Sequence, residues 1–191
     1  MQGIQREKEE VMIINEVLGI QKVIDPKIKI TTRHAVRAII IKDNKILMVH
    51  TNRGDYKFPG GGIKKFETHE QALRREVIEE TGYIVDEMQD EAGVIIQRNP
   101  NQFDTGGIFQ MTSYYYFCNV RNTRTKQHLD KYEQDQEFTP IWIDLDEVIA
   151  KNEAILTQKG THINPWVYRE TLALRSIKEA RVMEACNKEA Q

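Results

Sequence analysis

Apolar residues near the start of the chain recur at the spacing of a helix. The recurrent positions include Val11, Ile14, Val17 and Leu18. Together with a charged opening and the following Pro26, they predict an amphipathic leading helix over residues 7–20. The apolar stripe of such a helix usually packs against its own domain, and the alternative is that it contacts a second copy in a homodimer.

Short aliphatic runs separated by turn-forming residues predict a set of β-strands. The first two runs, residues 35–42 and 45–50, flank Asp43-Asn44 and predict a hairpin. An extended piece over residues 56–59 leads into three consecutive glycines. Further strands are expected over residues 93–98, 111–120 and 139–143, with polar loops over residues 99–107 and 121–136 between them.

Three helices are predicted after the hairpin. They cover residues 68–81, a short segment starting near Asp144, and residues 165–186. Strands mixed with helices, and joined more often by hairpins than by crossovers, indicate an α+β protein with a mixed β-sheet. No repeat or linker divides the sequence. We therefore expect residues 1–191 to form one domain, with residues 1–26 and 160–191 as peripheral helical extensions.

The charge balance excludes two classes of partner. The 191 residues include 27 lysines and arginines and 29 aspartates and glutamates, a formal net charge of −2. Proteins that bind long nucleic acids or anionic membranes usually carry a basic excess, and no apolar run approaches the ~20 residues of a membrane span. The two cysteines, Cys118 and Cys186, are too few for a disulfide framework. With a charged amino terminus, these features predict a soluble cytoplasmic protein.

The segment from Gly61 to Tyr83 carries the candidate chemistry, and its centre has clear helix boundaries. Thr68 and Gln71 have the spacing of a capping box at the start of a helix. Gly82 is suited to the left-handed conformation that ends a helix. The start and stop signals therefore agree on one helix.

Three glutamates share one side of this helix. At about 100° per residue, Glu80 lies roughly 40° from Glu76 in one direction and Glu79 roughly 60° in the other. Like charges this close repel, and the simplest interpretation is an acidic face in solvent. A bound divalent cation explains the crowding better, because Mg²⁺ binds through a few carboxylates together with substrate phosphates. Arg75, four residues before Glu79, can orient that carboxylate.

The glycines Gly60, Gly61 and Gly62 stand just before this helix. Consecutive glycines let the backbone approach a ligand closely and adopt conformations barred to other residues. A glycine-rich loop alone is weak evidence for a binding site. Placed directly before a capped helix that carries a carboxylate cluster, it predicts a site for phosphate and metal.

The whole segment reads G-x5-E-x7-R-E-U-x-E-E-x-G-U, where U is a bulky apolar residue. It resembles the Nudix box of the Nudix hydrolases, and the one departure is Tyr83, where that family usually has an aliphatic residue. The matching positions are Gly61, Glu67, Arg75, Glu76, Val77, Glu79, Glu80 and Gly82. The resemblance covers roughly residues 33–150 and implies the Nudix fold, a mixed β-sheet sandwiched between helices (α/β/α), with the N- and C-terminal helices as additions.

This resemblance implies a hydrolase that cuts the pyrophosphate of a nucleoside diphosphate linked to another group, with Mg²⁺ or Mn²⁺ as cofactor. The implied metal-facing carboxylates are Glu76, Glu79 and Glu80, and the carbonyl of Gly61 is a further candidate ligand. Arg75 is expected to orient the carboxylates. The implied substrate is a small nucleotide-type molecule, whose identity stays open.

The general base is left open, because Nudix enzymes draw it either from the box or from a later loop. Glu133 and Glu137, in the polar stretch before the last strand, are the loop candidates, and an ordinary solvated acid is an equal alternative for each. Arg37, on the first strand, and Lys57 are candidate phosphate contacts, together with Gly60–Gly62. For both cations, a surface position on a strand is the alternative.

Two other functions are known for this scaffold and fit the sequence less well. A non-catalytic nucleotide-sensing module usually loses carboxylates of the box, and none is lost here. An isomerase would use a cysteine as acid and base, and neither Cys118 nor Cys186 is near the box in sequence. The hydrolase is therefore the preferred prediction.

Overall fold

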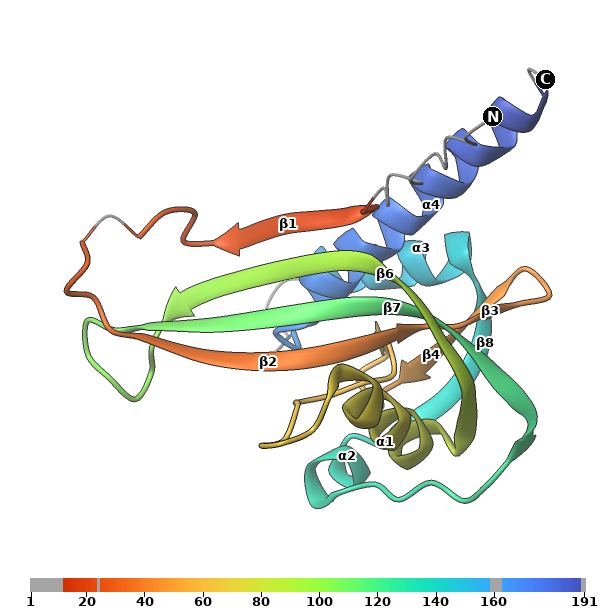
Figure 1. Ribbon diagram of the computed structural model, residues 1–191, viewed down its shortest axis with the longest axis horizontal. Coiled ribbons are helices and arrows are strands. Elements are labelled where there is room, and N and C mark those ends of the chain that lie inside the picture. The colour runs from red at the N-terminus through yellow and green to blue at the C-terminus, as the bar shows by residue number, and fades with distance from the viewer. Residues whose placement is uncertain (1–11, 24, 159–162, 190–191) are drawn as a thin grey trace, which may run out of the picture.

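Two four-stranded β-sheets and four helices form the part of the chain that the structure describes (Figure 1). The computed structural model describes residues 12–23, 25–158 and 163–189. The strands are β1 (Ile14–Gly19), β2 (Ile30–Ile39), β3 (Ile41–Lys42), β4 (Lys45–His50), β5 (Tyr56–Lys57), β6 (Tyr83–Pro100), β7 (Ile108–Arg124) and β8 (Thr139–Asp144). The helices are α1 (His69–Thr81), α2 (Lys131–Asp135), α3 (Leu145–Leu156) and α4 (Val167–Glu189).

Both parallel and antiparallel pairs build the sheets. The first sheet has the order β1-β6-β7-β2, in which β6 and β7 are antiparallel while β1 joins β6, and β2 joins β7, in parallel. In the second sheet β4 pairs with β3, β5 and β8, always antiparallel. The predicted α+β class with mixed strand pairing is confirmed.

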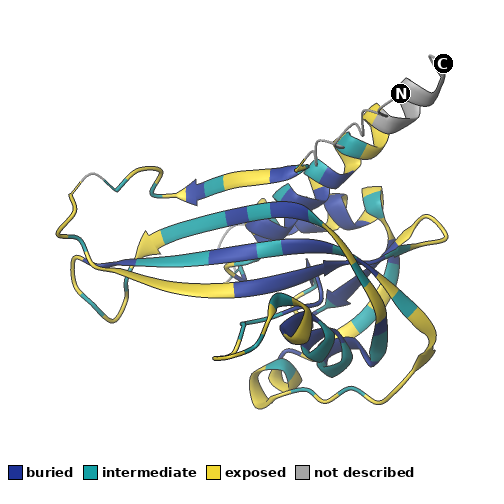
Figure 2. Cartoon of the chain, viewed as in Figure 1, coloured by how far each residue is buried: buried dark blue, intermediate teal, exposed yellow. Residues whose placement is uncertain are grey.

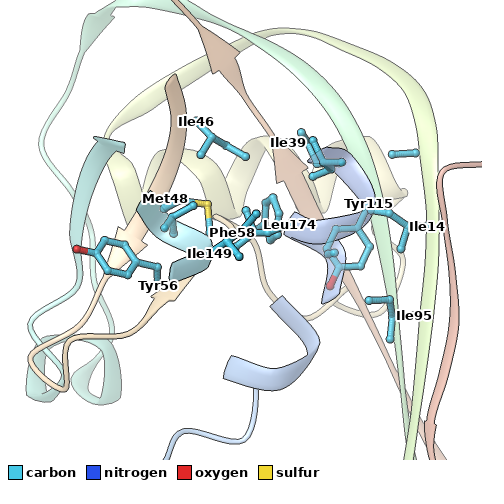
Figure 3. Packing of buried hydrophobic residues seen from close by; sticks show 14 of the residues in the cluster. Ile14, Ile39, Ile46, Met48, Tyr56, Phe58, Ile95, Tyr115, Ile149 and Leu174 are labelled. Carbon is cyan, nitrogen blue, oxygen red and sulfur yellow. The ribbon is translucent and has the colours of Figure 1, made fainter. Parts of the chain in front are cut away.

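Helices cover both sides of the strands. In β2, Val36 and Ala38 belong to the apolar cluster that contains Val77 of α1, whereas Ile39 belongs to the cluster that contains Leu174 of α4 (Figure 3). Successive strand residues point to opposite faces, so α1 lies on one side of the strands and α4 on the other. Burial in β2 begins half-way along the strand, where this sandwich starts (Figure 2). The predicted α/β/α arrangement is confirmed.

The predicted hairpin is present at its expected turn. Asp43 and Asn44 have φ angles of 49° and 60°, as the tight turn between two antiparallel strands requires. Lys42 pairs with Lys45 across this turn. The single strand predicted over residues 35–42 is divided at Ile40 into β2, which starts earlier than predicted at Ile30, and β3, which belongs to the other sheet.

The predicted leading helix is wrong for the part that the structure describes. Residues 14–19 form β1, and residues 7–11 lie outside the described residues. Ile14 and Leu18 are the buried pair of β1, and a spacing of four puts two residues on one face of a helix and of a strand alike. These residues form a strand because their backbone pairs with β6. Gly93 permits that pairing, because a Cβ there would lie 2.7 Å from the carbonyl carbon of Ile14.

The polar stretch over residues 121–136, predicted as a loop, contains regular structure at both ends. It holds the last residues of β7 and the short helix α2. Asp130 and Glu133 form a capping box at the start of α2, each side chain accepting the other residue's backbone N–H. The capping box therefore fixes where the Glu133 side chain lies.

The last helix is confirmed, but its first half is not peripheral. Ala173, Leu174 and Ile177 of α4 pack in the same core cluster as Phe58 and Tyr115 (Figure 3). The C-terminal part of α4 projects beyond the sheets (Figure 1). The beginning of α4 is therefore close enough to the glycine turn to take part in a site there.

Candidate active site

Helix α1 holds the predicted carboxylates between two well-defined ends. The hydroxyl of Thr68 accepts the N–H of Gln71 at 3.2 Å, and the side chain of Gln71 accepts the N–H of Thr68 at 2.9 Å, which confirms the capping box. Gly82, with φ 74°, ends the helix in the left-handed conformation. Leu73 and Val77 are fully buried against the sheet. This packing fixes the rotation of the helix and hence the direction of its acidic side.

Three carboxylates converge on one point beside this helix. One oxygen each from Glu76, Glu80 and Glu133 lies within 4.8 Å of the others. Glu76 and Glu80 are one helical turn apart and are buried, with exposed fractions of 8% and 2%. Glu133 is half-buried and comes from α2. The cluster thus joins two segments that are far apart in the sequence.

Hydrogen bonds tie the segment before α2 to the end of α1. The Gln127 side chain donates to the carbonyl of Glu80 at 2.6 Å and to that of Phe138 at 3.0 Å. The N–H of His128 donates to the carbonyl of Glu79 at 2.9 Å. Held there, the Glu133 carboxyl loses much of its hydration, and this burial, with the nearby charge of Glu80, raises its pKa to about 7.

Lys57 supplies a cation to the same cluster. Its ammonium forms an ion pair with Glu80 and donates to the carbonyl of Gly60 at 3.3 Å. The other Glu80 oxygen accepts the N–H of Gly60 at 2.9 Å. Burial nevertheless raises the pKa of Glu80, although the Lys57 charge and these hydrogen bonds oppose the shift. The guanidinium of Arg37 donates to the same Gly60 carbonyl, so both predicted phosphate contacts lie at the glycine turn.

At two of the glycines a Cβ would meet neighbouring atoms. Gly60 has φ 140°, and a Cβ there would lie 3.0 Å from the Cα of Arg37. At Gly61 a Cβ would lie 2.5 Å from the carboxyl carbon of Glu76. The backbone of the turn therefore runs directly against the acidic side of α1.

Arg75 connects the glycine turn to the helix. It forms a two-pronged ion pair with Glu67, at 2.6 and 2.8 Å, and donates to the Gly62 carbonyl at 3.1 Å. It also contacts the carboxylates of Glu76 at 2.5 Å and Glu79 at 3.2 Å. The pair with Arg75 lowers the pKa of Glu67 to about 2, and the pair raises the pKa of Arg75. Arg75 therefore contacts three glutamates and the glycine turn at once.

Three predicted site residues do not take part in the cluster formed by Glu76, Glu80 and Glu133. The Glu79 carboxylate is one-third exposed and is turned to Arg75. Glu137 is exposed and has a left-handed backbone, with φ 54°. The carbonyl of Gly61 accepts the N–H of Val36 at 3.0 Å. Of the two loop candidates for the general base, the structure brings only Glu133 to the cluster.

The donor set at the cluster fits a hard divalent cation. Carboxylate oxygens are the ligands that Mg²⁺ and Mn²⁺ prefer, and three of them, from Glu76, Glu80 and Glu133, converge here within 4.8 Å. Glu80 already pairs with one positive charge, the Lys57 ammonium. Glu76, Glu80 and Glu133 are the residues that could bind the metal.

The cluster opens into a cleft of about 560 Å³ with charges of both signs on its walls. Arg37, Lys57 and the three glycines line it, together with residues that the sequence analysis missed, namely Arg33, Asp130, Tyr132, Trp166 and Arg169. Asp130 carried a local signal, since Asp130 and Glu133 have capping-box spacing. Trp166 and Arg169 carried none, because only the docking of α4 brings them to the cleft.

Comparison with known proteins agrees with this architecture. The family model of the NUDIX domain matches residues 31–166. A NUDIX hydrolase from Nitrosomonas europaea, 24% identical, superimposes with a TM-score of 0.54 and covers 80% of this chain and 90% of its own. A MutT NUDIX hydrolase from Burkholderia pseudomallei, 19% identical, has a TM-score of 0.50 over 75% of this chain and 98% of its own.

A similar stretch of sequence occurs in a protein named ADP-ribose pyrophosphatase from Methanocaldococcus jannaschii. The two are 46% identical over 54 residues, which are 26% of this chain and 32% of that relative. The chain thus matches about a third of the relative's length. The family model, in contrast, spans most of the chain, including the glycine turn, the acidic helix and Glu133. This protein belongs to the NUDIX family.

Proposed function

We propose that this chain is a divalent-metal-dependent pyrophosphohydrolase that cleaves a nucleoside diphosphate linked to another group. The observation that carries the proposal is the convergence of Glu76, Glu80 and Glu133 in a cleft that is also lined by the cations Arg33, Arg37, Lys57 and Arg169. A pyrophosphate needs both features, because its negative charge repels an attacking water molecule until cations neutralise it.

The cleft residues divide the chemistry among them. Glu76 and Glu80 would hold the divalent cation, which when bound neutralises phosphate oxygens and lowers the pKa of a coordinated water. Glu133 accepts the proton of the attacking water as the new oxygen–phosphorus bond forms and the bridging bond breaks. Burial of its carboxyl in the cleft raises the pKa of Glu133, which makes it a stronger proton acceptor than an exposed glutamate. Lys57 and Arg37 stabilise charge on the phosphates.

Several finer assignments rest on the resemblance and stay proposals. Glu79 and the carbonyl of Gly61 are proposed as further ligands for additional cations, and Mg²⁺ and Mn²⁺ are both suitable. ADP-ribose belongs among the first substrates to test, since the Methanocaldococcus jannaschii relative is named for that activity.

We also propose the domain organisation, location and partners of this protein. Among the described residues, no helix is long and apolar enough to cross a membrane. One domain over residues 1–191, a cytoplasmic location, a homodimer, and the absence of a long nucleic-acid partner remain predictions from the sequence.

The proposal is tested with a panel of ADP-ribose, nucleotide sugars, dinucleoside polyphosphates and nucleoside triphosphates, each with Mg²⁺, Mn²⁺ or a chelator. We expect release of a phosphate or nucleotide product from at least one compound, and loss of this activity on chelation and in Glu80→Gln. Glu70→Gln is the matched control, because Glu70 lies on the same helix but is exposed and pairs with Arg74. Tight nucleotide binding without turnover across the panel would indicate a non-catalytic module instead.

A further inference from the structure

The beginning of α4 adds two charged side chains to the wall of the cleft. Arg169 lines the cleft and Glu170 lies directly behind it, and their exposed fractions are 5% and 0%. Both residues lie beyond the segment that the NUDIX family model matches. Neither was a candidate from the sequence. They therefore need an explanation of their own.

The Glu170 carboxylate organises three other groups. One of its oxygens accepts two hydrogen bonds from Arg169, at 2.6 and 3.1 Å, and lies 3.8 Å from the Nε of Arg37. The other oxygen accepts the N–H of Phe58 at 3.1 Å. A single carboxylate thus holds two guanidinium groups and the strand that leads into the glycine turn.

The charges in this group do not balance. Two buried guanidinium groups share the one carboxylate of Glu170, while the neighbouring Lys57 is paired with Glu80. The Nε of Arg37 is buried and has no hydrogen-bond partner among the described residues. Burial and the charge of Arg169 lower the pKa of Arg37. An excess positive charge and an unpaired donor, both out of water, are costly unless an anion compensates them.

We propose that Arg37 and Arg169 form an anion-binding subsite, held by Glu170, that takes a phosphoryl group of the substrate other than the one at the carboxylate cluster. The two guanidinium groups present planar sets of donors, which match the oxygens of a phosphate.

The subsite and the cluster meet at one residue of the glycine turn. The N–H of Gly60 binds Glu80 of the cluster, and its carbonyl binds Arg37 of the subsite. The two phosphates of a pyrophosphate would then lie on the two sides of Gly60. This inference rests on the proposed function for the identity of the natural ligand, but anion binding can be measured without catalysis.

The test is calorimetric titration of the full chain with inorganic pyrophosphate in the presence of a chelator, so that no metal holds the anion. We expect wild type to bind pyrophosphate and Arg169→Gln to bind it about tenfold or more weakly, since a hydrogen bond to a charged group is lost. Arg175→Gln is the matched control: Arg175 is on the same helix, is exposed, and pairs with Glu153. It should bind as wild type does.

A second variant separates anion binding from a purely structural ion pair. Glu170→Gln keeps an oxygen that can accept the Phe58 N–H but removes the competing negative charge, so pyrophosphate should bind about threefold or more tightly. The proposal is overturned if wild type does not bind pyrophosphate under chelation, or if folded Arg169→Gln, or Arg169→Ala in its place, binds it as wild type does. It is also overturned if Glu170→Gln weakens binding. If the three proteins bind pyrophosphate as expected but no compound of the substrate panel is hydrolysed, the anion subsite is supported and the proposed hydrolase activity is rejected.

Discussion

Gly61→Ala should lower kcat/KM strongly while leaving the fold intact. The added Cβ would lie 2.5 Å from the carboxyl carbon of Glu76, whereas ordinary contacts begin at 3.4 Å. The difference means that the carboxylate must move by about 1 Å. Displacements of this size in a catalytic group cost about 100-fold in rate. Because the obstacle is the end of a side chain and Gly61 has no left-handed φ, the backbone can stay in place.

The measurement compares kcat/KM at saturating Mg²⁺ with the free energy of unfolding in urea. We expect a loss of about 100-fold in kcat/KM and less than about 1 kcal/mol in stability. Gly106→Ala is the control, because nothing lies within 4 Å of its Cβ position and its φ of 87° is left-handed. That variant should lose roughly 1–2 kcal/mol of stability and keep its activity. Full activity in Gly61→Ala would refute the placement of Glu76.

Three further predictions concern stability. Glu67 has a pKa of about 2 in the folded protein because it pairs with Arg75. The stabilisation that this pair adds to the free energy of unfolding is therefore complete above about pH 5 and is lost as the pH falls towards 2. The difference in unfolding free energy between wild type and Glu67→Gln should shrink over that range; a constant difference would contradict the pairing. Gly93→Ala should cost about 2 kcal/mol or more and remove hydrogen-exchange protection from β1, because its Cβ would lie 2.7 Å from the carbonyl carbon of Ile14; unchanged protection would contradict the pairing of β1 with β6. Asn152 is fully buried and bonds the backbone N–H and C=O of the first residue of β5, at 2.9 and 3.0 Å. Asn152→Ala should lower the unfolding free energy by about 2 kcal/mol in thermal or urea melts, and an effect near zero would show that water replaces the side chain.

Local signals were sufficient for the hairpin and for α1. Two residues that tolerate positive φ defined the turn at Asp43-Asn44, and a capping box with a terminal glycine defined the helix. Local sequence did not suffice for β1, because the spacing of four between its apolar residues Ile14 and Leu18 fits one face of a helix and one face of a strand equally. Residues 14–19 form a strand because they pair with the edge of β6, which lies far along the chain.

The sequence by itself determined the acidic helix, the glycine turn directly before it and the contact between Arg75 and Glu79, because these features lie within one short segment. The bonds of Arg75 to Glu67 and to the Gly62 carbonyl emerged only in the tertiary structure. Only the tertiary structure decided that Glu133, rather than Glu79 or Glu137, joins Glu76 and Glu80. That choice depends on how the segment before α2 binds the end of α1. The docking of α4, which brings Arg169 and Glu170 to the cleft, likewise comes from packing between segments distant in sequence. Contacts between distant segments produce no periodic pattern of residues in either segment. For this reason the glycine turn and α1 were predictable from the sequence, whereas the positions of Glu133, Arg169 and Glu170 were not.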